Sequence, residues 1–170
     1  MNTVNARKPV SDRSQRRREA TLAEIKTAAR QQLVAGGPAA ISLRAIARDM
    51  GMTAPALYRY YPSLDSLVLD LCTDLYTELR LACEAAPGGV PIESRLQEMA
   101  REFRRWVLAH PPEAALMFGP PLPGMEKFIE HCGELQDAGA QFGDLFRQPM
   151  ARLGVGEAAF VGAWTRLYGV

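Results

Sequence analysis

Two short helical patterns joined at a glycine, within residues 42–66, restrict the fold of this chain more than any other feature of its sequence. Ser42 is suited to cap the first helix, because its hydroxyl can accept a backbone N–H group that a helix start leaves unpaired. Apolar residues then recur at steps of three and four, at Leu43, Ile46, Ala47 and Met50. This spacing predicts a helix with one face on a core.

Gly51 follows the first helix directly and can adopt the left-handed conformation that often ends a helix. Thr53 can cap a second helix in the same way as Ser42 caps the first. In this second helix, Ala56, Leu57 and either Tyr60 or Tyr61 are predicted to face the core. The two helices and their turn therefore have the layout of a helix-turn-helix.

The remaining side chains around the second helix are predicted to point outward: Thr53, Ala54, Tyr58 and Arg59. A short helix with outward tyrosine and arginine suits the major groove of DNA. The same pattern also fits an ordinary helical hairpin whose tyrosines only pack. From the pattern alone, both interpretations stay open.

Short motifs continue the pattern along the chain: Ser42-Leu43-Arg44, Ile46-Ala47, Met50-Gly51-Met52-Thr53, Leu57-Tyr58 and Tyr60-Tyr61-Pro62-Ser63, followed by Leu67. In residue type and spacing, these motifs resemble the N-terminal domain of the TetR family of transcriptional repressors, over residues 16–75. The resemblance implies a homodimeric repressor that a small-molecule ligand releases from DNA.

The resemblance also implies which residues contact DNA. Backbone or base contacts would come from Ser42 and Arg44, base-facing positions from Thr53, Ala54 and Arg59, and phosphate contacts from Tyr58 and Tyr60.

Two positions depart from the family pattern. Leu64 stands where many members have a basic residue, which removes one phosphate contact. Ala45 stands where many have an acidic residue, which removes the carboxylate of a capping box.

Charge is distributed unevenly along the chain, although the net charge is only +1. Residues 1–60 carry eleven Lys and Arg against four Asp and Glu, whereas residues 61–170 carry nine against fifteen. A basic front and an acidic rear fit a protein that docks one end on phosphates. Residues 1–15, with Arg7, Lys8 and Arg13, are expected to form a flexible basic arm that follows the DNA backbone, or a solubilising tail.

The composition is that of an ordinary globular protein, with 48% hydrophobic and 23% charged residues. The cysteines, Cys72, Cys83 and Cys132, lack the spacing of a disulfide framework or a zinc site. No apolar run approaches the ~20 residues that span a bilayer. We therefore expect a cytoplasmic protein without a metal, a cofactor or a membrane partner.

The helical patterns divide the chain into two domains after the arm. Residues 16–35 form a predicted helix that completes a three-helix DNA-binding domain, residues 16–62. A longer helix over residues 63–86 is expected to link this domain to the rear one and to carry motion between them. The rear domain, residues 63–170, is predicted to be a helical bundle for ligand binding and dimerisation.

Further helices are predicted in this rear domain over residues 91–110, 114–118, 125–146 and 157–170. Gly133, Gly139 and Gly143 are expected to kink or interrupt the third of these helices. No strand pattern of period two occurs, so the predicted fold class is all-α. The last helix stays apolar up to Val170 without a cap, and we expect the natural protein to continue beyond it.

Large apolar side chains in the rear domain are candidates for lining a ligand pocket: Met99, Phe103, Trp106, Met117, Phe118, Met125 and Phe128. Each is also the type of residue that fills an ordinary core. Polar residues among them are candidates for orienting a ligand: Tyr76, Arg104, His110 and His131. Together they predict a largely apolar effector.

Three classes of function follow from these patterns. The leading hypothesis is a ligand-responsive repressor that binds a palindromic double-stranded DNA operator as a homodimer. A constitutive DNA-binding protein without an effector is the second. An enzyme or carrier built on a helical bundle is the third, but the sequence has no phosphate-binding loop, nucleophile elbow or HExxH motif. We therefore expect no enzyme activity.

Overall fold

The computed structural model describes residues 9–85, 89–125 and 132–168, and in these residues it contains helices and no strand. The helices of the front part are α1 (Pro9–Gly36), the short 3-10 helix η1 (Pro38–Ala40), α2 (Leu43–Asp49) and α3 (Ala54–Tyr58). The rear part contains α4 (Leu64–Glu84), α5 (Ile92–Ala109), α6 (Pro111–Phe118), α8 (Gly133–Arg152) and α9 (Glu157–Tyr168). The predicted all-α fold class is confirmed.

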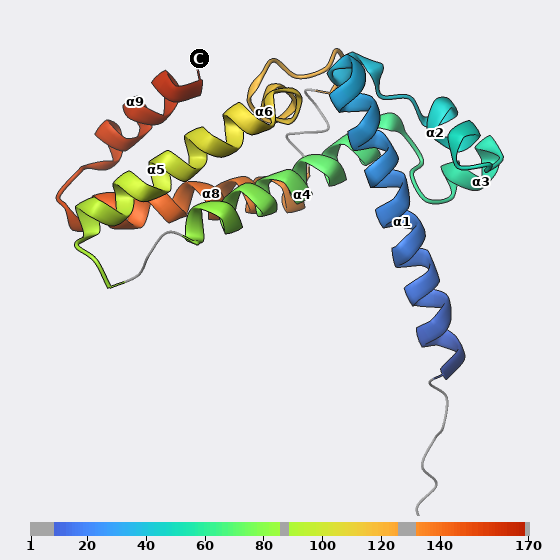
Figure 1. Ribbon diagram of the computed structural model, residues 1–170, viewed down its shortest axis with the longest axis horizontal. Coiled ribbons are helices and arrows are strands. Elements are labelled where there is room, and N and C mark those ends of the chain that lie inside the picture. Colours follow the sequence, from blue (N-terminus) through green and yellow to red (C-terminus); the bar gives the residue numbers. More distant parts are fainter. Residues whose placement is uncertain (1–8, 86–88, 126–131, 169–170) are drawn as a thin grey trace, which may run out of the picture.

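The front core forms where the apolar faces of α1, α2, α3 and the start of α4 meet. Its fully or almost fully buried members are Ile25, Ala29, Leu33, Leu43, Ile46, Leu57 and Leu67. Leu43, Ile46 and Leu57 are among the residues that the sequence pattern assigned to the core, and Ile25, Ala29 and Leu33 follow the same three- and four-residue steps on α1. Burial of this face packs α2 and α3 against α1, and they lie together at one end of the molecule (Figure 1).

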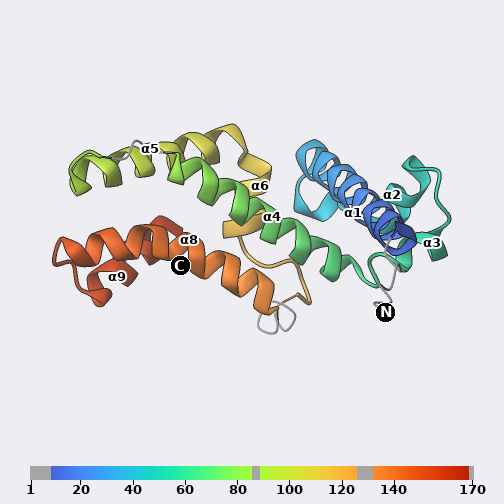
Figure 2. The same cartoon turned by 90° about the horizontal axis from the view of Figure 1, so that it is seen from below.

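α4 belongs to both parts of the molecule. It begins beside the helix-turn-helix and runs between α5 and α8 in the rear, as Figures 1 and 2 show. A reciprocal capping box fixes its start, since Ser63 accepts from the Ser66 N–H and the Ser66 hydroxyl accepts from the Ser63 N–H. Leu67, Leu71, Leu75 and Leu79 are buried along its length. The predicted linking helix is therefore present.

The front helix is longer than predicted. α1 begins at Pro9, so residues 9–15, which were expected in a flexible arm, are helical. An Asp12–Arg16 ion pair and a Gln15–Glu19 hydrogen bond, both four residues apart, stabilise this polar end. The expectation failed because it relied on an apolar stripe, and this end of α1 extends beyond the core (Figure 1). Residues 1–8, with Arg7 and Lys8, lie outside the described residues.

Two rear helices also differ from the prediction. α6 begins at Pro111 rather than Ala114, because a proline lacks only an N–H that the first turn would leave unpaired. The helix predicted from Met125 begins at Gly133 and extends to Arg152. Met125 is not helical, and Gly139 and Gly143 lie inside α8 without interrupting it. Packing against α4 outweighs the cost of these glycines, since Phe142 beside them is fully buried.

Among the helices that the structure describes, none is long and apolar enough to cross a membrane.

Candidate functional site

The turn between α2 and α3 is fixed by local hydrogen bonds. Gly51 has a φ of 64°, the left-handed conformation that glycine adopts without steric cost. The Met52 N–H donates to the Ala47 carbonyl at 2.8 Å. Ser42 Oγ accepts from the Ala45 N–H at 3.4 Å, and Thr53 Oγ1 accepts from the Ala56 N–H at 3.3 Å. Both predicted N-caps are confirmed.

Side chains on the inner face of α3 attach it to the rest of the front part. Leu57 is only 1% exposed, and Tyr61 rather than Tyr60 is the buried tyrosine. The Tyr61 hydroxyl donates to Asp70 Oδ2 at 2.5 Å. Lys26 of α1 pairs with Asp70 at 3.3 Å and with Asp74 at 2.5 Å. Burial and the Asp70 hydrogen bond raise the pKa of Tyr61, so its hydroxyl keeps its proton. The Tyr61 bond attaches the residues just after α3 to α4, and the Lys26 ion pairs attach α1 to α4.

The outer face of the motif presents the residues that the sequence selected for DNA contact. Arg44, Thr53, Tyr58 and Arg59 are exposed, with Tyr58 at 43%. The other selected residues, Ser42, Ala54 and Tyr60, are half-buried. The Ser42 and Thr53 hydroxyls already serve as caps, and the Arg18 guanidinium lies 5.2 Å from the centre of the Tyr60 ring.

Further cations lie near this face. The N-terminal half of α1 carries Arg13, Arg16, Arg17 and Arg18, and all four are exposed. Arg48 of α2 is also exposed and pairs with the adjacent Asp49 at 3.4 Å. A motif helix with outward tyrosine and arginine, next to a basic helix, is arranged to meet a phosphate backbone and a groove at once.

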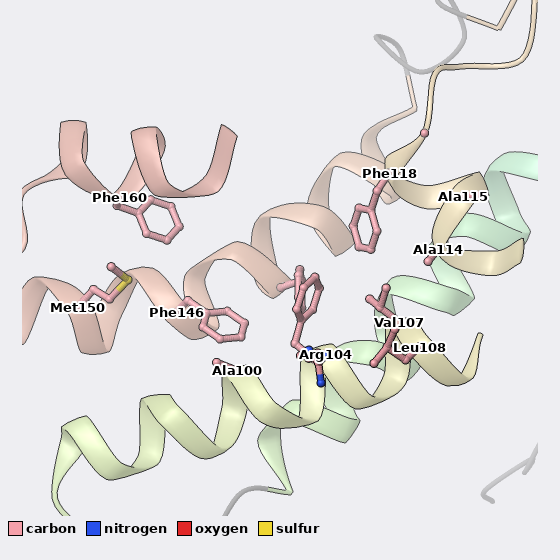
Figure 3. Close-up of a pocket in the computed structure, with 13 residues that line it drawn as sticks. Ala100, Arg104, Val107, Leu108, Ala114, Ala115, Phe118, Phe146, Met150 and Phe160 are labelled. Atoms are coloured by element: carbon pink, nitrogen blue, oxygen red, sulfur yellow. The ribbon is translucent and has the colours of Figure 1, made fainter. Parts of the chain in front are cut away.

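A rear pocket with a volume of about 760 Å³ lies between α5, α6, α8 and α9 (Figure 3). Among the described residues, Arg104 is the charged member of its walls, and the others are apolar: Ala100, Phe103, Val107, Leu108, Ala114, Ala115, Phe118, Gly119, Phe142, Phe146, Met150 and Phe160. Phe103 stacks on Phe142 at 5.9 Å between ring centres. This volume and lining are those of a site for a small organic ligand.

A network of charged groups lies between α1 and this pocket. Arg30 of α1 binds Glu78 of α4 through Nη1 at 2.6 Å and Glu113 of α6 through Nε at 3.0 Å. Trp106 Nε1 donates to Glu78 at 3.0 Å. Hydrogen bonds from Arg30 and Trp106 lower the pKa of Glu78, although partial burial opposes the shift. Glu113 is only 3% exposed, so Arg30 neutralises a buried carboxylate.

Comparison with known proteins identifies the family. A family model described as bacterial regulatory proteins, tetR family, matches residues 25–71, which run from α1 into α4. A second, described as tetracyclin repressor-like, C-terminal domain, matches residues 96–170, which begin in α5. The chain belongs to the TetR family. Its two matched regions are the helix-turn-helix part and the helical rear part of a TetR-family protein.

Individual relatives and structures agree with this assignment. The HTH-type transcriptional regulators Mb1846 of Mycobacterium bovis and Rv1816 of Mycobacterium tuberculosis are each 38% identical to this chain over 110 residues. The match covers 63% of this chain and 47% of each relative, so the chain spans about half the length of these curated relatives.

Solved structures also share the fold of this chain. The crystal structure of a candidate regulatory protein, SCO4313, has a TM-score of 0.68 and 33% identity, over 81% of this chain and 64% of that chain. A protein of unknown function from Rhodococcus sp. RHA1 shares the fold, with a TM-score of 0.70 and 22% identity, over 87% of this chain and 79% of that chain.

The structure separates the residues that were predicted for the ligand pocket. Phe103, Phe118 and Arg104 lie on the wall of the large pocket. Tyr76, Met117 and Met125 instead line a second pocket of about 370 Å³. There the Tyr76 hydroxyl donates to the Met117 carbonyl at 3.5 Å, and burial raises the pKa of Tyr76 to about 12.

Two of the predicted pocket residues are core residues. Met99 is fully buried and Trp106 is held by Glu78, and neither lines either pocket. The core side and the pocket side of α5 are both apolar, so the helical spacing of apolar residues cannot distinguish a residue that faces the core from one that faces the pocket. His110 donates from Nδ1 to the Trp106 carbonyl at 2.9 Å, and its ring lies 4.7 Å from the Trp106 ring. Phe128 and His131 lie outside the described residues.

Sequence reasoning missed the wall that α8 and α9 contribute: Phe142, Phe146, Met150 and Phe160. In the sequence these residues are only apolar positions of predicted helices, and a helical repeat gives no sign of which helix packs against which. Within the described residues, no group of three His, Cys, Asp or Glu side chains is arranged to hold a metal ion.

Proposed function

We propose that this protein is a transcriptional regulator that binds a palindromic DNA operator as a homodimer and leaves it when a largely apolar small molecule fills the rear pocket. The observation that carries the DNA-binding part is the outer face of α3, where Tyr58 and Arg59 are exposed next to a fully buried Leu57. Packing holds α3 firmly and leaves these two side chains free to enter a major groove.

Homodimerisation is proposed from family membership and from the rear surface. Members of this family pair two copies through the last helices, and each copy then presents one α3. Leu153, between α8 and α9, and Val161 of α9 are exposed apolar residues at 39% and 45%. A two-fold symmetric dimer that binds a palindromic operator would present its two α3 helices to half-sites about one turn of DNA apart, or a multiple of it.

The proposed ligand response uses the contact between α6 and α1. Ala114, Ala115 and Phe118 of α6 line the pocket, and Glu113 precedes them directly and binds Arg30 of α1. A ligand that pushes α6 would therefore move the carboxylate that holds α1. The ligand changes DNA affinity only if it binds the two positions of α6 with different affinity.

The test is binding of the full chain to fluorescently labelled DNA from upstream of its own gene, followed by anisotropy across a salt series. We expect tight binding that weakens steeply with salt and is lost in Tyr58→Ala. Arg105→Ala, an exposed arginine of α5, is the matched control and should bind as the wild type does.

Two results would count against the proposal. Equal binding to unrelated DNA of the same length would contradict an operator-specific role. A monomer by analytical ultracentrifugation that still binds the palindrome with full affinity would contradict the homodimer.

A further inference from the structure

Three arginines lie within five residues of α5, and they differ in their partners. Arg101 pairs with Glu98 and Arg105 pairs with Glu102, each with a carboxylate three residues away on the same helix. The residues three and four positions from Arg104 are Ala100, Arg101, Val107 and Leu108, so α5 offers it no carboxylate. Within the described part of the chain, Arg104 makes no ion pair.

Arg104 also lies on the wall of the large pocket, beside Val107 and Leu108 in Figure 3. It is the charged member among the described residues that line this pocket, and the other lining side chains are aliphatic or aromatic. In the part of the pocket that the structure describes, a broad apolar surface is therefore combined with one cation, Arg104. Neither Arg101 nor Arg105 lines the pocket.

We propose that the pocket binds an amphipathic anion: an apolar body of aromatic or long aliphatic carbon with one carboxylate or sulfonate group, which Arg104 holds. The apolar body would lie against Phe118, Phe146 and Phe160, where burial of carbon surface favours binding. A guanidinium matches the two oxygens of a carboxylate with parallel N–H groups, and such charge-assisted bonds are stronger than neutral ones. A cationic ligand would be repelled at the same place.

This inference rests on the proposed ligand-binding role, and its test uses no DNA. The probes are 8-anilinonaphthalene-1-sulfonate, an aromatic anion, and N-phenyl-1-naphthylamine, which has the same ring system without the sulfonate. Fluorescence titration of the full chain gives a dissociation constant for each. The variants are Arg104→Gln, the matched control Arg105→Gln, and Ala100→Trp, which fills the pocket from an exposed position of α5.

We expect Arg104→Gln to weaken binding of the sulfonate probe by about tenfold and to leave the neutral probe within a factor of two. Arg105→Gln should change neither constant by more than that factor. Ala100→Trp should weaken both probes, while circular dichroism shows an unchanged helical content.

Equal losses of the sulfonate probe in Arg104→Gln and Arg105→Gln would overturn the inference, since only general charge would then matter. So would undiminished binding in Ala100→Trp, which would place the probe elsewhere. If Arg104→Gln changes the oligomeric state without changing probe selectivity, Arg104 serves a contact between copies and the inference fails. Each of these outcomes leaves the DNA-binding test untouched, and loss of operator binding leaves the probe result standing.

Discussion

The two ends of this molecule place their functional residues in opposite ways. At the front, the residues proposed to contact DNA lie on one short segment, α2 to α3, and point away from the core. At the rear, the pocket is assembled from α5, α6, α8 and α9, and some of its walls are also core. Phe142 shows the difference, because it lines the pocket and is fully buried, whereas Tyr58 is 43% exposed. Substitution of a DNA-contact residue at the front should therefore change binding without changing the free energy of unfolding. Substitution of a pocket residue at the rear should change both ligand binding and the free energy of unfolding.

The largest effect is expected at the rear, for Phe142→Ala. Phe142 is fully buried and packs against Tyr76, Phe103 and Phe146. Removing the ring should lower the free energy of unfolding by about 4 kcal/mol and also alter probe binding in the pocket. Urea denaturation measures the first quantity. Val161→Ala, at an exposed position, should change stability by less than about 0.5 kcal/mol. A small loss in Phe142→Ala would mean that the rear pocket is independent of the core.

A smaller effect, on binding alone, is expected at the front. Tyr58→Ala and Arg59→Ala should each weaken operator binding by about 1–3 kcal/mol, because each removes a contact to a base or phosphate. Neither should change the unfolding free energy by more than about 0.5 kcal/mol, since both side chains are exposed. Comparison with non-specific DNA distinguishes the roles. If Arg59→Ala weakens binding to every sequence equally, Arg59 contacts phosphate and does not read bases.

The turn between α2 and α3 gives an intermediate case. Gly51→Ala introduces a methyl group that meets no atom within 4 Å, but it forces alanine into the left-handed conformation at φ 64°. We expect a loss of about 1 kcal/mol in unfolding free energy. Thermal denaturation measures it, with Gly133→Ala as a control, since Gly133 has a negative φ and open space around it. An unchanged melting temperature for Gly51→Ala would show that the turn relaxes freely.

The smallest effect concerns pH and the contact between the two ends. The pKa of Glu78 is lowered below its ordinary value of 4.5, so its bond to Arg30 stabilises the fold at neutral pH. This contribution is complete above about pH 4.5 and is lost as the pH falls through the lowered pKa. It should be under about 1 kcal/mol, because both side chains are partly exposed. In Glu78→Gln, urea denaturation below pH 4.5 should show a shallower loss of stability than in the wild type. Parallel curves would contradict the assignment.

Local rules are sufficient for the front part. Ser42, Thr53 and Ser63 cap helices in the structure because a cap requires only a side chain and an N–H two or three residues later. Gly51 ends α2 for an equally local reason. The buried and exposed sides of α2 and α3 follow from a helical repeat over fewer than ten residues. These features were therefore available from the sequence.

The rear part depends on contacts between residues far apart in the chain. Arg30 meets Glu113, 83 residues later, and Phe103 stacks on Phe142. No repeat or cap in the sequence predicts either contact. The same apolar spacing on α5 applies to buried Met99 and to the pocket residue Phe103, so it does not distinguish core from pocket. Arg104 was predicted as a polar residue that orients a ligand, and it does line the pocket. Its difference from Arg101 and Arg105, which pair with carboxylates of their own helix, is visible only in the structure.

By itself, the sequence determined the helix-turn-helix, its caps, its outward residues and the family, because each of these is encoded within about one or two turns of helix. Only the tertiary structure decided which apolar side chains line a pocket, and that α6 is bonded to α1 through Arg30. The physical reason is that a helix periodicity fixes which residues share a face, while the partner of that face is chosen by packing of the whole chain.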